Sequence, residues 1–130
     1  MKYKPMLAHP VGGYERIKDE DWPLYSQYKL DGVRCVIQRD NSQVTAYSRT
    51  GKEWKNIDHI LMELIPFFEK HPSVVLDGEL YNHKFKDDFE QIISMVRKTK
   101  PTDYDRKVSK ICVQFHCYDM INRKMNFKTR

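Results

Sequence analysis

The chain has 130 residues, a length typical of one domain with a buried core. Hydrophobic residues make up 40% and charged residues 32% of the chain, a balance that argues against a disordered tail. The net charge of +5 suits a polyanionic partner such as nucleic acid or a nucleotide, although many soluble proteins are as basic. No segment approaches the roughly 18 apolar residues of a membrane span, so we expect no membrane partner.

Three cysteines lie within apolar runs and lack the CxxC spacing of a zinc or redox site: Cys35, Cys112 and Cys117. We expect buried, reduced thiols. Because disulfides persist only in oxidising compartments, this pattern predicts a cytoplasmic, reducing location. The amino-terminal residues lack the continuous apolar run of a signal peptide, which agrees with that location.

The first 23 residues are predicted to be an extended lead-in, because prolines and glycines interrupt them. Residues 24–30 then alternate in polarity, which predicts a strand. One face of this strand carries polar side chains, namely Tyr25, Gln27 and Lys29. Asp31 and Gly32 predict a hairpin turn into a second strand over residues 33–38, which is rich in β-branched residues.

A turn over residues 39–42 and a third strand over 43–48 follow. Between residues 56 and 70 the apolar period changes to that of a helix packing one stripe on a sheet. The stripe consists of Ile57, Ile60, Leu61, Leu64, Ile65 and Phe68. Pro66 is expected to kink or divide this helix.

Residues 74–82 predict another strand, and Asp87 or Asp88 can cap a second helix. The buried stripe of that helix is Phe89, Ile92, Ile93 and Val96. A polar connection over 99–105 precedes an alternating strand over 110–121. Its apolar face carries Ile111, Val113, Phe115 and Cys117, and its polar face carries Gln114, His116 and Tyr118. Interleaved strands and helices with early hairpins predict an α+β fold, with antiparallel or mixed sheets and flanking helices.

Lys29 lies on a partly polar strand face, which can line a cleft. With a reference pKa of about 10.4, a lysine is protonated at neutral pH and is a poor nucleophile. In a desolvated cleft near other cations it can lose its proton and attack an electrophile. Asp31 adds a carboxylate nearby, and Arg34 can hold phosphate oxygens with two hydrogen bonds. Taken alone, the stretch is better explained as an exposed strand lysine beside an ordinary turn.

Two further groups of residues are candidates for binding or catalysis. SRTGKEW, residues 48–54, ends the third strand with Arg49 and a glycine turn. Asp77 and Glu79 are two residues apart on a predicted strand, so their carboxylates face the same way. Such a pair suits a metal ion or ribose hydroxyls, and it is equally compatible with a solvated strand edge.

Four motifs in this order resemble those of the covalent nucleotidyltransferases: KLDGVR at residues 29–34, SRTG at 48–51, LDGEL at 76–80, and the pair Tyr118 and Asp119. KPMLA at residues 4–8 and DDFEQIISMVRK at 87–98 are most similar to ATP-dependent DNA ligases, especially small viral or phage enzymes. The resemblance covers nearly the whole chain. It implies an ATP-grasp-like nucleotidyltransferase domain.

The resemblance implies a reaction for this domain. Lys29 would attack the α-phosphate of ATP, with Mg²⁺ on the triphosphate, to form lysine-AMP and release pyrophosphate. AMP would then pass to the 5′-phosphate at a nick in double-stranded DNA, and the 3′-hydroxyl would displace it. Gln27 and the backbone near Tyr28 would contact adenine. Asp31 would act around the AMP phosphate, chiefly in the sealing step.

The resemblance also implies roles for four residues on later strands. Arg34 would act around the AMP phosphate and the nick. Arg49 would contact the 5′-phosphate of the nick or the nucleotide sugar. Glu79 would bind the ribose hydroxyls or help to place the divalent metal. Tyr118 would stack on the adenine ring.

In the family, the adenylation domain continues into an acidic EG-type motif and a KxK motif, and an OB-fold domain follows. Residues 1–130 contain neither motif and no OB-fold, so we expect a partial adenylation domain with weak or no ligation alone. The C-terminal part of the ligase is an expected partner, and for a viral enzyme the location is the host cytoplasm. Two alternatives stay open. One is an RNA ligase or mRNA capping nucleotidyltransferase, and the other is a non-catalytic nucleic-acid-binding remnant.

Overall fold

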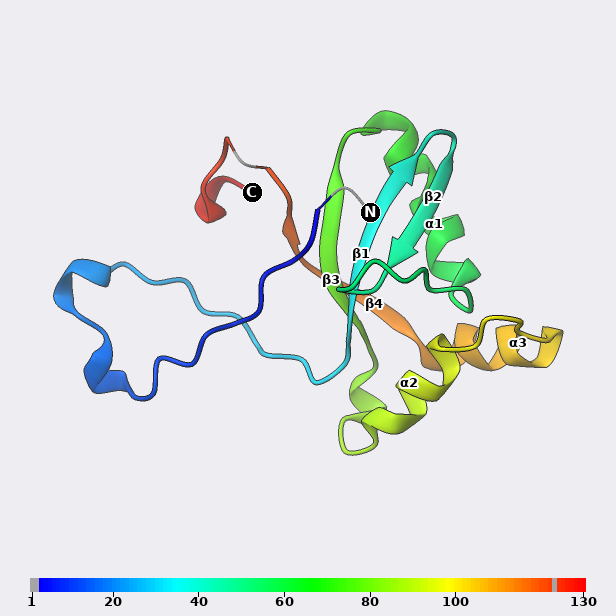
Figure 1. Ribbon diagram of the computed structural model, residues 1–130, viewed down its shortest axis with the longest axis horizontal. Coiled ribbons are helices and arrows are strands. Elements are labelled where there is room, and N and C mark those ends of the chain that lie inside the picture. Colours follow the sequence, from blue (N-terminus) through cyan, green and yellow to red (C-terminus); the bar gives the residue numbers. More distant parts are fainter. Residues whose placement is uncertain (1–2, 123) are drawn as a thin grey trace.

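A four-stranded antiparallel sheet in the order β2-β1-β3-β4 forms the centre of the computed structural model, which describes residues 3–122 and 124–130 (Figure 1). The strands are β1 (Val33–Asp40), β2 (Gln43–Tyr47), β3 (Val75–Tyr81) and β4 (Gln114–Met120). The helices are α1 (Asp58–Lys70), α2 (Phe89–Val96) and α3 (Asp103–Cys112). Short 3₁₀ turns are η1 (Tyr14–Arg16), η2 (Asp19–Asp21), η3 (His83–Phe85) and η4 (Phe127–Thr129). The α+β prediction is confirmed.

The two faces of the sheet differ in chemistry. One face packs on the helices, and its apolar residues form a single buried cluster with residues of α1 and α2. Members of this cluster include Cys35, Ile37, Leu76, Leu80, Ile57, Ile60, Phe68, Ile92 and Val96. Burying one such side chain contributes roughly 1.5–3 kcal/mol to folding, so this face supplies most of the apolar burial. The opposite face carries Arg34 on β1 and Asp77 and Glu79 on β3.

Residues 24–30 are not a strand, and the predicted hairpin at Asp31 and Gly32 is wrong. Residues 24–29 are exposed in irregular backbone, and no strand pairs with the segment among the described residues. Alternating polarity stabilises a strand only when one face is buried against a partner, and here neither face is. The first hairpin instead joins β1 and β2, where Asn41 adopts a left-handed conformation with φ of 55°.

The lead-in is extended over the residues described, apart from η1 and η2; its first part runs beside the sheet and the part that contains η1 and η2 projects away from it (Figure 1, blue). Residues 1 and 2 of that predicted segment lie outside the described residues. Among the three cysteines, all of which are free thiols, Cys35 is buried whereas Cys117 is exposed, which corrects the expectation for Cys117. Among the residues described, no helix is both long and apolar enough to cross a bilayer.

Pro66 does not divide α1, which runs as one helix from Asp58 to Lys70. A proline at this position cannot donate to the carbonyl of Met62. Because Met62 is 68% exposed, water can reach that side of the helix and limit the cost. Most of the predicted stripe packs toward the sheet, but Ile65 is 43% exposed.

Helix α3 was not predicted. Residues 99–105 were predicted to be a loop, and residues 110–112 were predicted to be the start of a strand. The missed signal is a capping box. The Asp105 backbone N–H donates to Thr102 Oγ1 at 3.2 Å, and the Thr102 N–H donates to Asp105 Oδ2 at 2.9 Å. A hydrogen bond from Lys98, with those from Thr102, lowers the pKa of Asp105 to about 2.

Thr102→Ala should lower the free energy of unfolding by about 1 kcal/mol, because it removes one half of this capping box. Urea unfolding followed by circular dichroism measures the change. Thr99→Ala is the matched control, since Thr99 is exposed and precedes the helix. Equal losses in the two variants would show that the box does not hold α3.

The pKa of Asp105 is lower in the folded chain than in the unfolded chain. Its contribution to the free energy of unfolding is therefore complete above about pH 4 and is lost as the pH falls toward 2.

Candidate active site

An ion pair between neighbouring strands lies at the centre of the polar sheet face. The Arg34 guanidinium donates to both carboxylate oxygens of Asp77, from Nε at 2.7 Å and from the terminal nitrogen at 2.6 Å. A third donor of Arg34 reaches the carbonyl of Met6 at 3.4 Å, which ties the KPMLA segment to the sheet. Hydrogen bonding to Asp77 raises the pKa of Arg34, so the guanidinium stays charged. The sequence did not predict this pairing.

Glu79 and Tyr118 lie next to this ion pair. The Tyr118 hydroxyl donates to Glu79 Oε2 at 3.2 Å, and the Arg34 guanidinium carbon lies 5.3 Å from the centre of the Tyr118 ring. Burial raises the pKa of Glu79, and the hydrogen bond from Tyr118 opposes this. Burial also raises the pKa of Tyr118, so the phenol is a donor throughout the neutral range. The three residues predicted from separate motifs are therefore in contact.

A β-bulge in β4 orients Tyr118. The register pairs Gly78 with Cys117 and Asp77 with Asp119, so Tyr118 is the extra residue. As a result Tyr118 and Asp119, although consecutive, both reach the polar face, which Asp119 shares with its partner Asp77. The Tyr118 carbonyl accepts a hydrogen bond from Gln27 Nε2 at 2.9 Å. Gln27 is thereby placed beside Tyr118.

Lys29 is not desolvated, which corrects the expected cleft environment. Its side chain is 84% exposed, and its ammonium lies 2.9 Å from Asp31 Oδ1. The hydrogen bond to Asp31 raises the pKa of Lys29, which is the opposite of nucleophile activation. Lys29 is exposed because the segment that carries it is exposed coil, so no neighbouring strand covers the lysine.

Lys29 nevertheless lines a hollow of about 490 Å³ together with Asp31 and Glu79. Its wall also includes Lys86 from the connection between η3 and α2, and Phe89, the first residue of α2. Phe89 was predicted to belong to the buried stripe of α2, but it is 37% exposed at this hollow. Lys29, Asp31 and Glu79 therefore share one site, and Lys86 is a further cation there that the sequence did not predict.

Gly32 connects Asp31 to β1 at a close approach of two backbones. A Cβ atom built on Gly32 would lie 2.3 Å from the Leu80 carbonyl oxygen and 2.8 Å from Glu79 Cγ. The glycine of the KLDGVR motif is therefore required for space beside β3, rather than for a left-handed hairpin turn.

Gly32→Ala should lower the free energy of unfolding by about 2 kcal/mol, because the methyl group cannot fit without moving β1 away from β3. Urea titration monitored by tryptophan fluorescence would measure this loss. An unchanged midpoint would mean that the two strands separate at negligible cost.

Two of the predicted site residues, Tyr28 and Arg49, do not line the Lys29 hollow. Tyr28 is 96% exposed. Arg49 lies in the turn after β2, and its Nε is buried without a hydrogen-bond partner among the described residues. That turn leads into Trp54, whose Nε1 donates to the Arg34 carbonyl at 3.3 Å and so holds the segment against β1.

The residues present fit a metal ion that arrives with a nucleotide, rather than a resident ion. No cluster of three or more His, Cys, Asp or Glu side chains suited to a metal occurs in the described part of the chain. At the Lys29 hollow Glu79 supplies a carboxylate beside Asp31 and Asp87, of which Asp31 is paired with Lys29, while Asp77 is paired with Arg34. Mg²⁺ is commonly held by one or two carboxylates and by substrate phosphates, which this arrangement allows.

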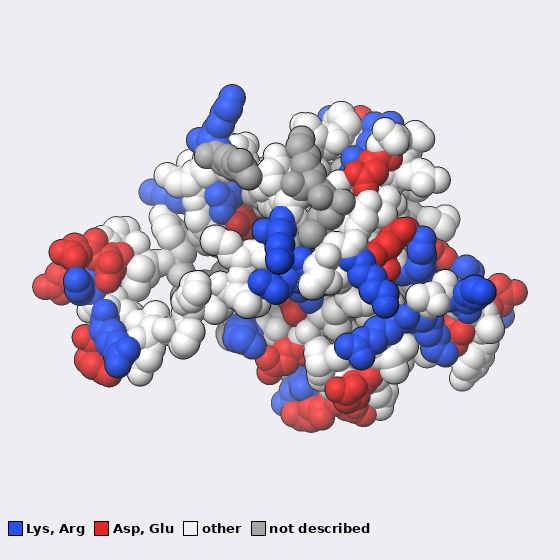
Figure 2. Space-filling model, in the orientation of Figure 1, with Lys and Arg blue, Asp and Glu red and all other residues white. Residues whose placement is uncertain are grey.

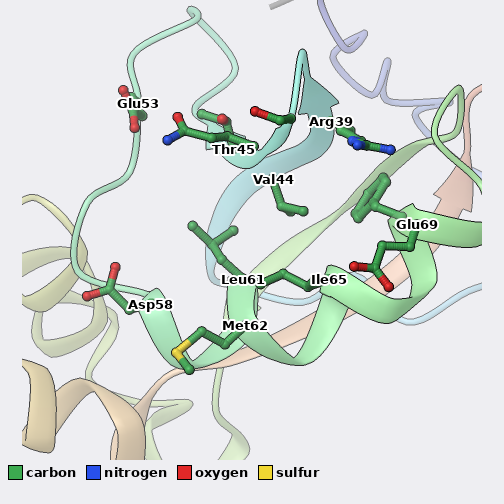
Figure 3. A pocket seen from close by; sticks show the side chains of 12 residues that line it. Arg39, Val44, Thr45, Glu53, Asp58, Leu61, Met62, Ile65 and Glu69 are labelled. Carbon is green, nitrogen blue, oxygen red and sulfur yellow. The ribbon is translucent and has the colours of Figure 1, made fainter.

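A different hollow of about 560 Å³ lies between β2 and α1 (Figure 3). Val44 of β2 points toward Leu61 and Ile65 of α1, and charged residues such as Arg39 and Glu69 stand at its rim. Lys29, Asp31 and Glu79 do not line it. We therefore assign the candidate site to the opposite side of the sheet.

A lysine beside a sheet face that carries a guanidinium and a carboxylate is typical of a domain that handles a phosphorylated nucleotide. The family model for the ATP dependent DNA ligase domain matches residues 5–127 of this chain. The chain therefore belongs to the ATP-dependent DNA ligase domain family.

Curated relatives are DNA ligases from different sources. The DNA ligase of Archaeoglobus fulgidus is 29% identical over 120 residues, which is 89% of this chain and 21% of the relative. A probable DNA ligase of Saccharopolyspora erythraea is 36% identical over 76 residues, 58% of this chain and 15% of the relative. The DNA ligase of African swine fever virus is 41% identical over 70 residues, 51% of this chain and 16% of the relative. The chain spans about a fifth or less of the length of these relatives.

The fold is similar to that of a solved structure, Pmar-Lig_PreS3, with a TM-score of 0.53 and 27% sequence identity. The match covers 74% of this chain and 21% of that chain. The similarity includes only part of the neighbour, as with the curated relatives.

Proposed function

We propose that the chain is the nucleophile-bearing part of an ATP-dependent DNA ligase, with Lys29 as the residue that carries AMP. One observation supports this most: within a chain of the ligase family, Lys29 and Asp31 of KLDGVR and Glu79 of LDGEL line the same hollow. The reaction forms a bond from Lys29 Nζ to the α-phosphorus of ATP and breaks the bond from that phosphorus to the bridging oxygen. Pyrophosphate leaves, and the proton of Nζ passes to solvent.

Adenine recognition is assigned to Gln27 and Tyr118. The Gln27 amide nitrogen donates to the Tyr118 carbonyl. The amide oxygen, Oε1, therefore remains as the acceptor that the exocyclic amine of adenine requires. Arg34 lies over the Tyr118 ring, so adenine would stack on the other face of that ring. The backbone near Tyr28 completes this part of the proposal, since it precedes Lys29 directly.

Glu79 is assigned to the ribose hydroxyls or to Mg²⁺ that enters with ATP. A half-buried carboxylate fixed by Tyr118 can accept from ribose hydroxyls or provide one oxygen ligand to a metal. Bound Mg²⁺ would offset the negative charge of the triphosphate.

Arg34 and Arg49 are assigned to the phosphates of AMP and of nicked DNA. Two of the five N–H groups of Arg34 are used by Asp77 and a third by Met6, so donors remain for a phosphate oxygen. Arg49 has a buried Nε without a partner in the described part of the chain, which a phosphate or sugar oxygen could satisfy. Asp31 would act in the sealing step, with the C-terminal part of the ligase as partner. Sealing DNA inside a cell fits a cytoplasmic location.

The decisive experiment is covalent labelling by ATP carrying a radioactive α-phosphate, in the presence of Mg²⁺. We expect slow labelling that survives denaturation, is absent in Lys29→Ala and persists in Lys84→Ala, an exposed lysine outside the site. Label that persists in Lys29→Ala would refute the assignment. Labelling by GTP in preference to ATP would favour a capping-type enzyme. Salt-dependent binding to nicked DNA without covalent label would favour a non-catalytic module.

A further inference from the structure

A cavity on the helical side of the sheet combines basic side chains with an unsatisfied buried oxygen. Its volume is about 220 Å³, and it lies between the first turn of α1 and the later part of α3. Its walls include Asn56, Asp58, Arg106, Lys107 and Lys110. It shares no lining residue with the Lys29 hollow, so it is a separate feature.

The cavity carries an excess of positive charge. Arg106 is paired with Asp58 at 3.1 Å, which neutralises both. Neither Lys107 nor Lys110 forms an ion pair with any residue that the structure describes. In addition, α1 begins after Ile57 without a side-chain cap, and the carboxylate of its first turn, Asp58, is the one paired with Arg106, so the positive end of the helix dipole adds to the charge of the two lysines. The excess of positive charge therefore favours an oxyanion as the ligand of this cavity.

Asn56 adds a requirement for a hydrogen-bond donor. The residue is 1% exposed, and its amide nitrogen donates to the carbonyls of Met95 at 3.1 Å and Asp105 at 3.3 Å. Because both partners are acceptors, the orientation of the amide is fixed. Its Oδ1 is buried and has no hydrogen-bond partner among the described residues. A buried acceptor left in this state costs roughly 1–3 kcal/mol, which a ligand that donates to it would recover.

We propose that this cavity binds a phosphate group that still carries a proton. The lysines and the start of α1 neutralise the oxyanion, and the P–O–H donates to Asn56 Oδ1. Inorganic phosphate keeps at least one proton throughout the neutral range, and a phosphate monoester keeps its last proton below a pKa of about 6. Sulfate has the same shape and no proton, so the site discriminates against it. Free phosphate and the terminal phosphate of a DNA strand share the required chemistry.

The test is a titration of the full, isotope-labelled chain with sodium phosphate, followed by backbone and side-chain amide signals at constant ionic strength. We expect saturable shifts at Asp58, His59 and the Asn56 side chain, and sulfate binding about tenfold weaker. Lys107→Ala combined with Lys110→Ala should weaken phosphate binding about tenfold. The matched control combines Lys70→Ala, at the other end of α1, with Lys84→Ala. Shifts that do not saturate, equal affinity for sulfate, or an equal loss in the control pair would overturn the proposal.

Competition identifies the source of the phosphate. Displacement by a 5′-phosphorylated duplex near pH 6, and not by its 5′-hydroxyl counterpart, assigns the site to a DNA end. Binding of inorganic phosphate that neither duplex displaces assigns it to free phosphate. Both outcomes support the site, and neither depends on Lys29, so Lys29→Ala should leave phosphate binding unchanged.

Discussion

Covalent labelling of this chain by ATP should rise about tenfold for each pH unit between about pH 7 and about pH 9. The reason is the ion pair between Lys29 and Asp31, whose nitrogen and oxygen lie 2.9 Å apart. Hydrogen bonding and charge from Asp31 raise the pKa of Lys29, so almost all of it is protonated at neutral pH. Below the pKa, the fraction of neutral amine grows tenfold with each unit of pH, and the attacking species is that amine.

Asp31→Asn gives the sharpest check, because it removes the charge while keeping the shape of the side chain. The pKa of Lys29 should fall, and the first step should become faster at about pH 8 than in the parent chain. The measurement is the initial rate of covalent labelling over the pH series. Lys29→Ala gives the blank, and a rate independent of pH would show that proton loss from Lys29 does not limit this step.

The elements that were predicted correctly are those that bury an apolar pattern in the common core. Strands β1, β2 and β3 and helices α1 and α2 each carry such a pattern and contribute to one buried cluster. Residues 24–30 show the limit of this reasoning, since alternation does not reveal whether a partner strand exists. Helix α3 was missed for the opposite reason. Its side chains are mostly polar, so the local capping box of Thr102 was a clearer signal than any apolar run.

The candidate site was predictable where strand parity decides the direction of a side chain. Parity placed Tyr118 on the polar face, and the hydroxyl does reach Glu79 there. The environment of Arg34 was not predictable, because its partner Asp77 is 43 residues away and the contact depends on the register of β1 with β3. The predicted environment of Lys29 was wrong for a related reason: the sequence does not reveal how exposed the side chain is.

Breaking the Arg34 and Asp77 ion pair should have the largest effect on stability among the ion pairs described. The carboxylate side chain of Asp77 is only 10% exposed and the Arg34 side chain 28%, so Asp77→Ala leaves a poorly solvated cation beside the Tyr118 ring. Removing one partner of a buried pair costs about 3 kcal/mol. Urea unfolding should therefore show a large fall in midpoint with an unchanged slope.

Two matched variants separate this effect from a general loss of charge. Asp58→Ala breaks the pair with Arg106, whose side chains are 46% and 50% exposed, and should cost no more than about 0.5 kcal/mol. Replacing both partners, with Arg34→Met and Asp77→Leu together, should recover most of the loss, because no charge is then left without a partner. A double variant as unstable as Asp77→Ala would mean that the polar sheet face depends on this ion pair for its geometry. In that case the position of Tyr118 and Glu79 would also depend on it, because Arg34 lies over the same ring that contacts Glu79.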